Sequence, residues 1–413
     1  MIRQNFNADW TVEKGDGNSR MNSFLGNTQT KTVHLPYDAM IHEARTPDTK
    51  NGAQTGFYPG GEYIFQKHFT APQAWQGKPV SLVFEGVYQT ALVYLNGWLL
   101  TRNVNGYAEF TVDAGPYLKY GVDNLLKVIA DNSLEPNSRW YTGSGIYRPV
   151  RLLVGNKVYL PQDTVRITTR EVGEGFALLD VTAQVQSAST VTERVTLQQT
   201  ICREGTAVLT DRQNLLLQPG ESRTVSFRYC VDSPALWSPE NPNLYTSTMQ
   251  VLEGEEELDR EETSFGIRTL SIDAAHGVRI NGQTVKLRGA CIHHDNGILG
   301  AATLPDAEER RIRQLKEAGF NAIRSSHHPA GRALLDACDR YGVLVMDELS
   351  DVWNVRKNPY DYALYFEQDW KPTIQKMVAK DYNHPSVILY CVGNEISEAG
   401  SESGAETNRR LCN

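Results

Sequence analysis

The pattern of apolar and polar positions begins with a long region of short β-strands. Residues 1–157 contain strand-like segments, such as Tyr63–Phe69, that are broken by Gly, Pro and Asn. Ala91–Leu95, Asn96-Gly97 and Trp98–Leu100 form a strong hairpin signal, because Asn-Gly tolerates the positive φ angles of a type I′ turn. Many short strands without helical periodicity predict a jelly-roll sandwich here, a fold that often binds sugars.

A second β region follows over residues 158–271. Leu178–Val185 and Thr224–Tyr229 show partial alternation of apolar and polar residues, which is typical of half-buried antiparallel strands. A region of about 110 residues with frequent turns predicts an immunoglobulin-like β-sandwich. Nothing in this region suggests chemistry, so we interpret it as a spacer domain.

From residue 272 to residue 413 the pattern changes to strands that alternate with helices. Pro305 is expected to begin one helix, which Gly319 ends, and Gly342 is expected to end the next. The predicted strands are Val285–His293, Ala322–Ser325, Val343–Met346 and Val387–Val392. The last of them lacks polar alternation, which predicts a strand buried on both faces. Repeated βα units without a dinucleotide-binding Gly motif favour the first half of a (β/α)₈ TIM barrel over a doubly wound sheet.

Polar, ionisable residues follow each of these four strands. The clusters are His293-His294-Asp295, Ser326-His327-His328, Asp347-Glu348 and Asn394-Glu395. Because the carboxyl ends of barrel strands hold ligands and catalytic groups, the clusters predict a pocket for a polar, uncharged ligand such as a sugar. The alternative is a set of unrelated surface loops, in which Asn394 and Glu395 only open the next helix.

The four histidines also permit a metal site. Its ligands would be His293, His294, His327 and His328. Adjacent residues on an extended segment point in opposite directions, so at most one histidine of each pair faces the pocket. We therefore assign no metal ligands and expect no required cofactor. A divalent cation is compatible with such a pocket, but no ligand pattern indicates one.

Two segments resemble glycoside hydrolase family 2, the β-galactosidase, β-glucuronidase and β-mannosidase family. The first runs from Asn321 to Pro329 and on through Asp336 to Glu348, and the second comprises Asn383–Val387 with Gly393-Asn394-Glu395. They occur in the order and spacing of the family. The resemblance implies a retaining exo-β-glycosidase with an N-terminal sugar-binding domain, an immunoglobulin-like domain and a TIM-barrel catalytic domain.

The resemblance also implies roles for individual residues. Glu395 matches the acid/base, Asn394 the residue that hydrogen-bonds the sugar 2-hydroxyl, and His327 a substrate contact. We expect His294, Asp295 and Asp347 to line or support the same substrate pocket, and Arg324 to brace a carboxylate.

One segment of the first domain adds two further candidates. Arg139–Pro149 matches the family at Ser144–Arg148, and in some members a loop near this point reaches the pocket. Arg139 and Trp140 are therefore candidates for substrate binding, with an ordinary surface loop as the alternative.

The nucleophile of the family is a Glu well downstream of Gly-Asn-Glu, and no residue of this sequence corresponds to it. We therefore expect the 413 residues to be inactive alone. His293–Ala302, Asp351–Trp353 and Asn358–Tyr362 look most like the bacterial β-galactosidase branch, which predicts terminal β-galactosides as substrates. β-Glucuronidase and β-mannosidase activity are the alternatives within the family. A non-catalytic carbohydrate-binding module is the alternative from another class.

Composition and charge narrow the range of partners. The 413 residues are 40% hydrophobic and carry a net charge of −8 without a basic stripe, which argues against nucleic acid and anionic membranes. No apolar run is long enough to span a bilayer, so we expect a small-molecule carbohydrate as the partner; assembly into a homo-oligomer stays open. The chain start lacks an apolar signal core, and the six cysteines include no close pair. These features predict a cytoplasmic protein, although a secreted form whose signal peptide has been removed fits equally well.

Overall fold

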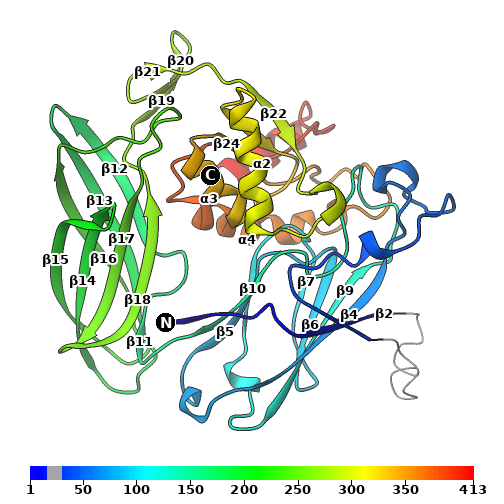
Figure 1. The fold of residues 1–413 in the computed structure, drawn as a ribbon, viewed down its shortest axis with the longest axis horizontal. Coiled ribbons are helices and arrows are strands. Elements are labelled where there is room, and N and C mark those ends of the chain that lie inside the picture. Colours follow the sequence, from blue (N-terminus) through cyan, green and yellow to red (C-terminus); the bar gives the residue numbers. More distant parts are fainter. Residues whose placement is uncertain (16–29) are drawn as a thin grey trace.

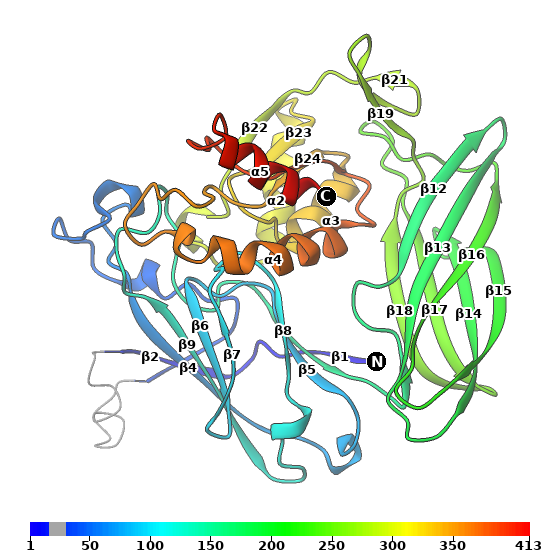
Figure 2. The ribbon, with the colours of Figure 1, turned by 180° about the vertical axis from the view of Figure 1, so that it is seen from behind.

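A computed structural model of the chain describes residues 1–15 and 30–413. Figure 1 shows a blue-to-cyan β-domain, a green β-domain beside it, and a yellow-to-red α/β segment above the first domain. The view from behind shows the same arrangement, with the yellow-to-red segment again over the blue-to-cyan domain (Figure 2).

The first domain is a sandwich of two antiparallel sheets, which confirms the predicted jelly-roll class. One sheet has the order β3-β2-β4-β9-β6-β7, with bounds Lys31–Val33, Trp10–Lys14, Gly61–Thr70, Asp123–Asn132, Thr90–Leu95 and Trp98–Asn103. The other has the order β1-β10-β5-β8, with bounds Ile2–Asn5, Val150–Val154, Val80–Phe84 and Phe110–Asp113. Trp10, Phe65 and Phe84 are fully buried in the core of this domain. Asn96 and Gly97 adopt φ angles of 53° and 89° between β6 and β7, as the hairpin signal required.

The second domain is also a two-sheet antiparallel sandwich, as the sequence predicted. β11, β12, β13 and β16 form one sheet, with bounds Val158–Tyr159, Arg166–Gly173, Phe176–Ser187 and Ser222–Asp232. β14, β15, β17 and β18 form the other, with bounds Glu193–Arg203, Thr206–Leu217, Tyr245–Glu253 and Glu256–Phe265. Alternate residues are buried from Ala177 to Val185 in β13 and from Val195 to Ile201 in β14, so the alternation in the sequence marks the inner face. A small sheet of β19, β20 and β21 (Leu270–Asp273, Gly277–Ile280 and Gln283–Thr284) leads to the third region.

The third region is a four-stranded parallel sheet in sequential order, which confirms the predicted barrel segment. Its strands are β22 (Gly289–Ile292), β23 (Ala322–Ser325), β24 (Leu344–Glu348) and β25 (Val387–Cys391). The helices are α2 (Pro305–Glu317), α3 (Arg332–Tyr341), α4 (Phe366–Asp381) and α5 (Glu402–Cys412). As predicted, α2 begins at Pro305, and Gly342 ends α3 in the left-handed region at φ 65°. Within the described ranges, no helix is long and apolar enough to cross a membrane.

Two predictions about these strands were wrong. β22 begins four residues later than the sequence suggested. β25 is not buried on both faces, because Tyr390 is 42% exposed. Among the described residues β25 pairs only with β24, so its other edge and part of its faces stay open.

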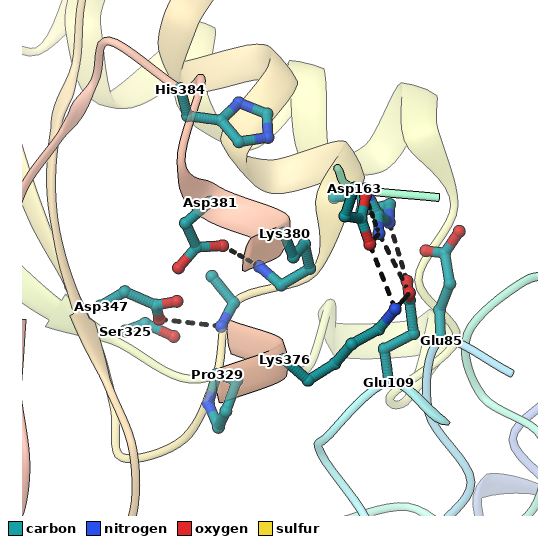
Figure 3. Close-up of polar contacts among 12 residues, drawn as sticks. Glu85, Glu109, Asp163, Ser325, Pro329, Asp347, Lys376, Lys380, Asp381 and His384 are labelled. Carbon is teal, nitrogen blue, oxygen red and sulfur yellow. Dashed lines mark hydrogen bonds and ion pairs between the residues drawn. The ribbon is translucent and has the colours of Figure 1, made fainter. Parts of the chain in front are cut away.

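A cluster of buried charges joins the jelly roll to the helices of the barrel segment (Figure 3). Glu109, just before β8, accepts hydrogen bonds from Arg332 Nε and Nη2 of α3 at 2.7 and 3.0 Å. Arg332 also contacts Asp163 at 2.7 Å, and Lys376 of α4 lies 3.2 Å from Glu109 and 3.1 Å from Asp163. Buried charges are tolerated only when they are paired, so this cluster fixes how α3 and α4 sit on the jelly roll.

Replacing Arg332 by Met should destabilise the chain, because it leaves Glu109 and Asp163 buried without their main cation. We expect the free energy of unfolding to fall by about 3–5 kcal/mol, measured by urea denaturation, with faster hydrogen exchange in α3 and α4. Arg340→Met is the matched control. Arg340 lies on the same helix but pairs with Glu309 at the surface, so its loss should cost less than about 1 kcal/mol. Equal losses in the two variants would contradict the interpretation.

The same cluster predicts a sensitivity to acid. Burial alone would raise the pKa of Glu109, but Arg332 and Lys376 outweigh burial and lower this pKa. A carboxyl whose folded pKa is lowered stabilises the fold above its unfolded value, about pH 4.3, and this contribution is lost as the pH falls further. Arg332→Met should therefore flatten the acid limb of the stability curve.

Candidate active site

The carboxyl ends of the barrel strands face a cleft that the jelly roll closes from the other side. The lining from the jelly roll includes Tyr88, Tyr107, Asn137 and Trp140. The lining from the barrel segment includes His327, Asp351, Asp361 and Tyr362. Two domains therefore build one site, at the strand ends where the sequence predicted it.

Glu348, at the end of β24, organises the barrel side of this cleft. Its carboxylate is completely buried and accepts hydrogen bonds from Arg324 Nε and His327 Nδ1, each at 2.5 Å. Arg324 Nη2 also donates to Asn394 Oδ1 at 3.0 Å. Arg324 thus braces a carboxylate, as predicted. Because His327 directs Nδ1 at Glu348, the other ring nitrogen is available to a ligand in the cleft.

Asp351 connects the two domains at the mouth of the site. Its carboxylate accepts from Arg139 Nη2 at 2.7 Å and Nε at 3.1 Å, from Asn394 Nδ2 at 2.8 Å, and from Lys357 Nζ at 2.9 Å. Burial alone would raise the pKa of Asp351, but these hydrogen bonds outweigh burial and lower this pKa. Asp351 is therefore a fixed negative charge that orients Arg139 and Asn394.

Glu395 lies beside this network and is open to solvent. Its Oε2 accepts from Arg139 Nη1 at 3.1 Å, and 69% of its side chain is exposed. Its φ angle of 45° is uncommon for a residue other than Gly and turns the chain sharply after Asn394, which is 4% exposed. A carboxyl group held by one arginine at the rim of a cleft can exchange protons with a ligand there.

An aromatic wall from the jelly roll faces the strand ends. The Trp140 ring stacks on His293 with a centroid distance of 5.0 Å, and its Nε1 donates to Tyr107 Oη at 3.0 Å. Tyr107 in turn stacks on His328 with a centroid distance of 3.9 Å. Apolar ring faces beside polar groups suit a sugar, which has apolar C–H faces and polar edges.

The structure does not bring every predicted pocket residue to the cleft. His294 is buried against the jelly roll, where its Nε2 donates to the Thr142 carbonyl at 2.9 Å. Burial lowers the pKa of His294 to about 3. Asp347 is fully buried below the strand ends, and Asp295 contributes its backbone carbonyl to Arg311. His294 and Asp347 therefore do not line the cleft, although Asp347 supports it by accepting the backbone N–H groups of Ala330 and Glu348.

The strand-end histidines do not gather as metal ligands. His294 and His328 face the jelly roll, and His327 forms a hydrogen bond with Glu348. Within the described ranges, the group with metal-like spacing is Asp336, Asp339 and His384, away from the cleft. Asp339 accepts hydrogen bonds from Ser386 and His384, and these hydrogen bonds explain why Asp339 and His384 lie together.

Sequence reasoning missed the roles of Glu348, Asp351 and Lys357. Glu348 and Asp351 lay within segments that were singled out, but their partners are distant in sequence; Arg139 and Asp351 are 212 residues apart. Lys357 Nζ also donates to the Asn394 carbonyl at 2.7 Å. No periodicity or motif marks Lys357, so nothing in the pattern could have indicated it.

Family models match three consecutive parts of the chain. Residues 10–163 match the glycosyl hydrolase 2 galactose-binding domain-like model, and residues 158–268 match the glycosyl hydrolases family 2 model. Residues 274–408 match the glycosyl hydrolases family 2 TIM barrel domain.

Individual proteins show the same likeness. The chain is 37% identical over 406 residues to beta-galactosidase BoGH2A of Bacteroides ovatus, covering 98% of the chain and 48% of that protein. It is 32% identical over 396 residues to a putative beta-glucuronidase of Formosa agariphila, covering 95% of the chain and 37% of that protein. The solved structure of a glycosyl hydrolase family 2 member from Bacteroides cellulosilyticus has a TM-score of 0.95 and 36% identity, and the match covers 100% of this chain and 54% of that one. The chain thus spans about half the length of these relatives or less.

The burial of His294 predicts a measurable loss of stability in mild acid. The folded chain does not protonate this residue at pH 5, whereas the unfolded chain does so below about pH 6.5. Protons therefore favour unfolding, and His294 should lower the free energy of unfolding by about 2 kcal/mol between pH 7 and pH 5. In urea denaturation, the free energy of unfolding of His294→Gln should therefore change by about 2 kcal/mol less between pH 7 and pH 5 than that of the unchanged chain. Parallel curves for the two proteins would contradict the prediction.

Proposed function

Because the chain belongs to glycoside hydrolase family 2, we propose that it forms part of a retaining exo-β-glycosidase that removes terminal β-galactosides from oligosaccharides. The observation that carries the proposal is the position of Asn394-Glu395 after the fourth barrel strand, where Asn394 bonds Asp351 of the shared cleft directly and Glu395 is joined to Asp351 through Arg139. This position suits a group that gives a proton to the leaving oxygen of a bound sugar.

Glu395 is proposed as the acid/base. In a retaining mechanism, one carboxylic acid protonates the leaving group while a second carboxylate, about 5–5.5 Å away, attacks the sugar. The acid then acts as a base toward water. Glu348 is committed to Arg324 and His327, and Asp351 to Arg139 and Lys357, so we assign neither carboxylate as nucleophile. We propose that the nucleophile lies outside these 413 residues.

Asn394 and His327 are proposed to hold the sugar. The Asn394 amide is oriented by its partners, because Oδ1 accepts from Arg324 and Nδ2 donates to Asp351. One N–H and one lone pair remain, which matches a sugar hydroxyl that both accepts and donates. His327 adds its second ring nitrogen, and Trp140 offers a ring face.

An uncharged sugar fits the cleft better than a uronic acid. The described lining includes two carboxylates, Asp351 and Asp361, and neither lysine nor arginine; Arg139 and Lys357 lie beside it, and both are paired with Asp351. A substrate carboxylate would therefore find no unpaired cation among the residues that line the described cleft, and its desolvation would cost binding free energy. The relative with 37% identity is named a beta-galactosidase, and the one with 32% identity a putative beta-glucuronidase. These observations support a galactoside, with glucuronides and mannosides as the competing substrates.

Replacing Glu395 by Gln in the full-length enzyme should remove the acid without changing its shape. We expect kcat for lactose-like substrates to fall by about 100- to 10,000-fold, because their leaving groups need a proton. Substrates with very acidic leaving groups should keep their glycosylation rate, and azide should restore turnover by replacing water. Glu402→Gln, at an exposed position on α5, is the control and should leave kcat unchanged. Wild-type hydrolysis of lactose by Glu395→Gln would refute the assignment.

The choice of sugar is tested with nitrophenyl β-galactoside, β-glucuronide and β-mannoside. We expect kcat/KM of the full-length enzyme for the galactoside to exceed that for the glucuronide by about 100-fold or more, because the glucuronide carboxylate would find no unpaired cation in the described lining of the cleft. The 413-residue chain should hydrolyse none of the three glycosides, so its rate serves as the background control. A glucuronide hydrolysed as fast as the galactoside would move the assignment to β-glucuronidase.

A further inference from the structure

Two carboxyl groups meet in the interior below the cleft. Asp347 is on β24 and Asp381 is the last residue of α4, and they are 0% and 1% exposed. Figure 3 shows the two side chains pointing toward one another, and among the described residues the Oδ2 atom of each is buried without a hydrogen-bond partner. Two ionised carboxylates have only acceptors, so the facing oxygens can satisfy each other only if a proton lies between them.

The charges around the pair balance only one ionised carboxylate. Lys380 is also buried, and its ammonium group contacts Asp381 Oδ1 (Figure 3). With both carboxyls ionised, the interior would hold two negative charges against one positive charge; one shared proton makes the group neutral. Within the described part of the chain, Tyr390 of β25 and His384 also face the pair, and His384 is paired with Asp339.

Asp347 also holds the backbone of the candidate active site. Its Oδ1 accepts the N–H of Glu348 at 3.0 Å and the N–H of Ala330 at 2.8 Å. Glu348 carries the carboxylate that binds His327, and Ala330 follows the loop on which His327 lies. One oxygen atom therefore ties together the two backbone segments whose side chains form the 2.5 Å contact.

We propose that Asp347 and Asp381 share one proton, which resides on Asp347, and that Asp347 is thereby a positioning residue for the His327–Glu348 pair. The Lys380 ammonium group contacts Asp381, whereas the hydrogen bonds that Asp347 accepts come from neutral backbone N–H groups, so the proton is assigned to Asp347. Burial, with the added effect of Asp381, raises the pKa of Asp347 well above its ordinary value, in agreement with this placement. Loss of the proton would set two carboxylates against each other and push the end of α4 away from β24.

The shared proton is tested on the 413-residue chain without any assay of activity. Infrared spectra at pH 7 of protein with ¹³C-labelled aspartate carboxyls should lose the carbonyl stretch of a protonated acid when Asp347 is replaced by Asn. Asp336→Asn, at an exposed position on α3, should instead lose the stretch of an ionised carboxylate. If Asp347→Asn removes an ionised carboxylate, the proposal is wrong, whatever the enzyme turns out to hydrolyse.

The positioning role rests on the proposed function and is tested in the full-length enzyme. Asp347→Leu removes the acceptor for both N–H groups and should lower kcat/KM on the order of 30-fold, whereas Asp347→Asn keeps an oxygen there and should lower it about threefold. In a His327→Ala background, Asp347→Leu should cost less than about threefold further, because the residue acts through His327. The positioning role would be overturned if Asp347→Asn and Asp347→Leu lowered kcat/KM equally. It would also be overturned if Asp347→Leu caused its full loss of kcat/KM in the His327→Ala background. If the Asp347→Leu variant does not fold, a fall in kcat/KM of more than about 30-fold in Asp347→Asn would contradict the positioning role.

Discussion

The Asp351 carboxylate is the interaction on which the arrangement of the candidate active site depends. It accepts hydrogen bonds from the jelly roll through Arg139, from its own loop through Lys357, and from the end of β25 through Asn394. A largely buried carboxylate is stable only when such donors satisfy it. The two domains must therefore be docked for Asn394 and Glu395 to take their places, and the jelly roll is a structural part of the site.

Local features of the structure could be predicted from the sequence because they depend on near neighbours. The Asn96-Gly97 hairpin and the Gly342 helix end follow from backbone conformations that few residues adopt. The location of the site could be predicted because the carboxyl ends of parallel strands meet at one edge of a sheet. The three family models then showed the family and the domain architecture, while relatives named for two different sugars left the substrate to be argued from the cleft.

The side chains that enter the site could not be predicted in the same way. Alternation along a strand shows that neighbours point in opposite directions, but not what covers each face. His294 turned out to face the jelly roll, and Asp347 to face the end of α4. The long-range partners of Asp351 and Glu348 were hidden for a related reason, since a contact between distant residues leaves no periodic signal in a single sequence.

Asp347 and Glu348 show how strongly the surroundings decide what a carboxyl group does. They are consecutive residues on one strand, both completely buried, and chemically almost the same. Glu348 points toward Arg324 and His327 and faces positive charge, whereas Asp347 points toward Asp381 and faces negative charge. The period of two along the strand therefore separates two electrostatic environments: one on the ligand side, where a fixed negative charge orients donors, and one on the helix side, where only a neutral group is stable.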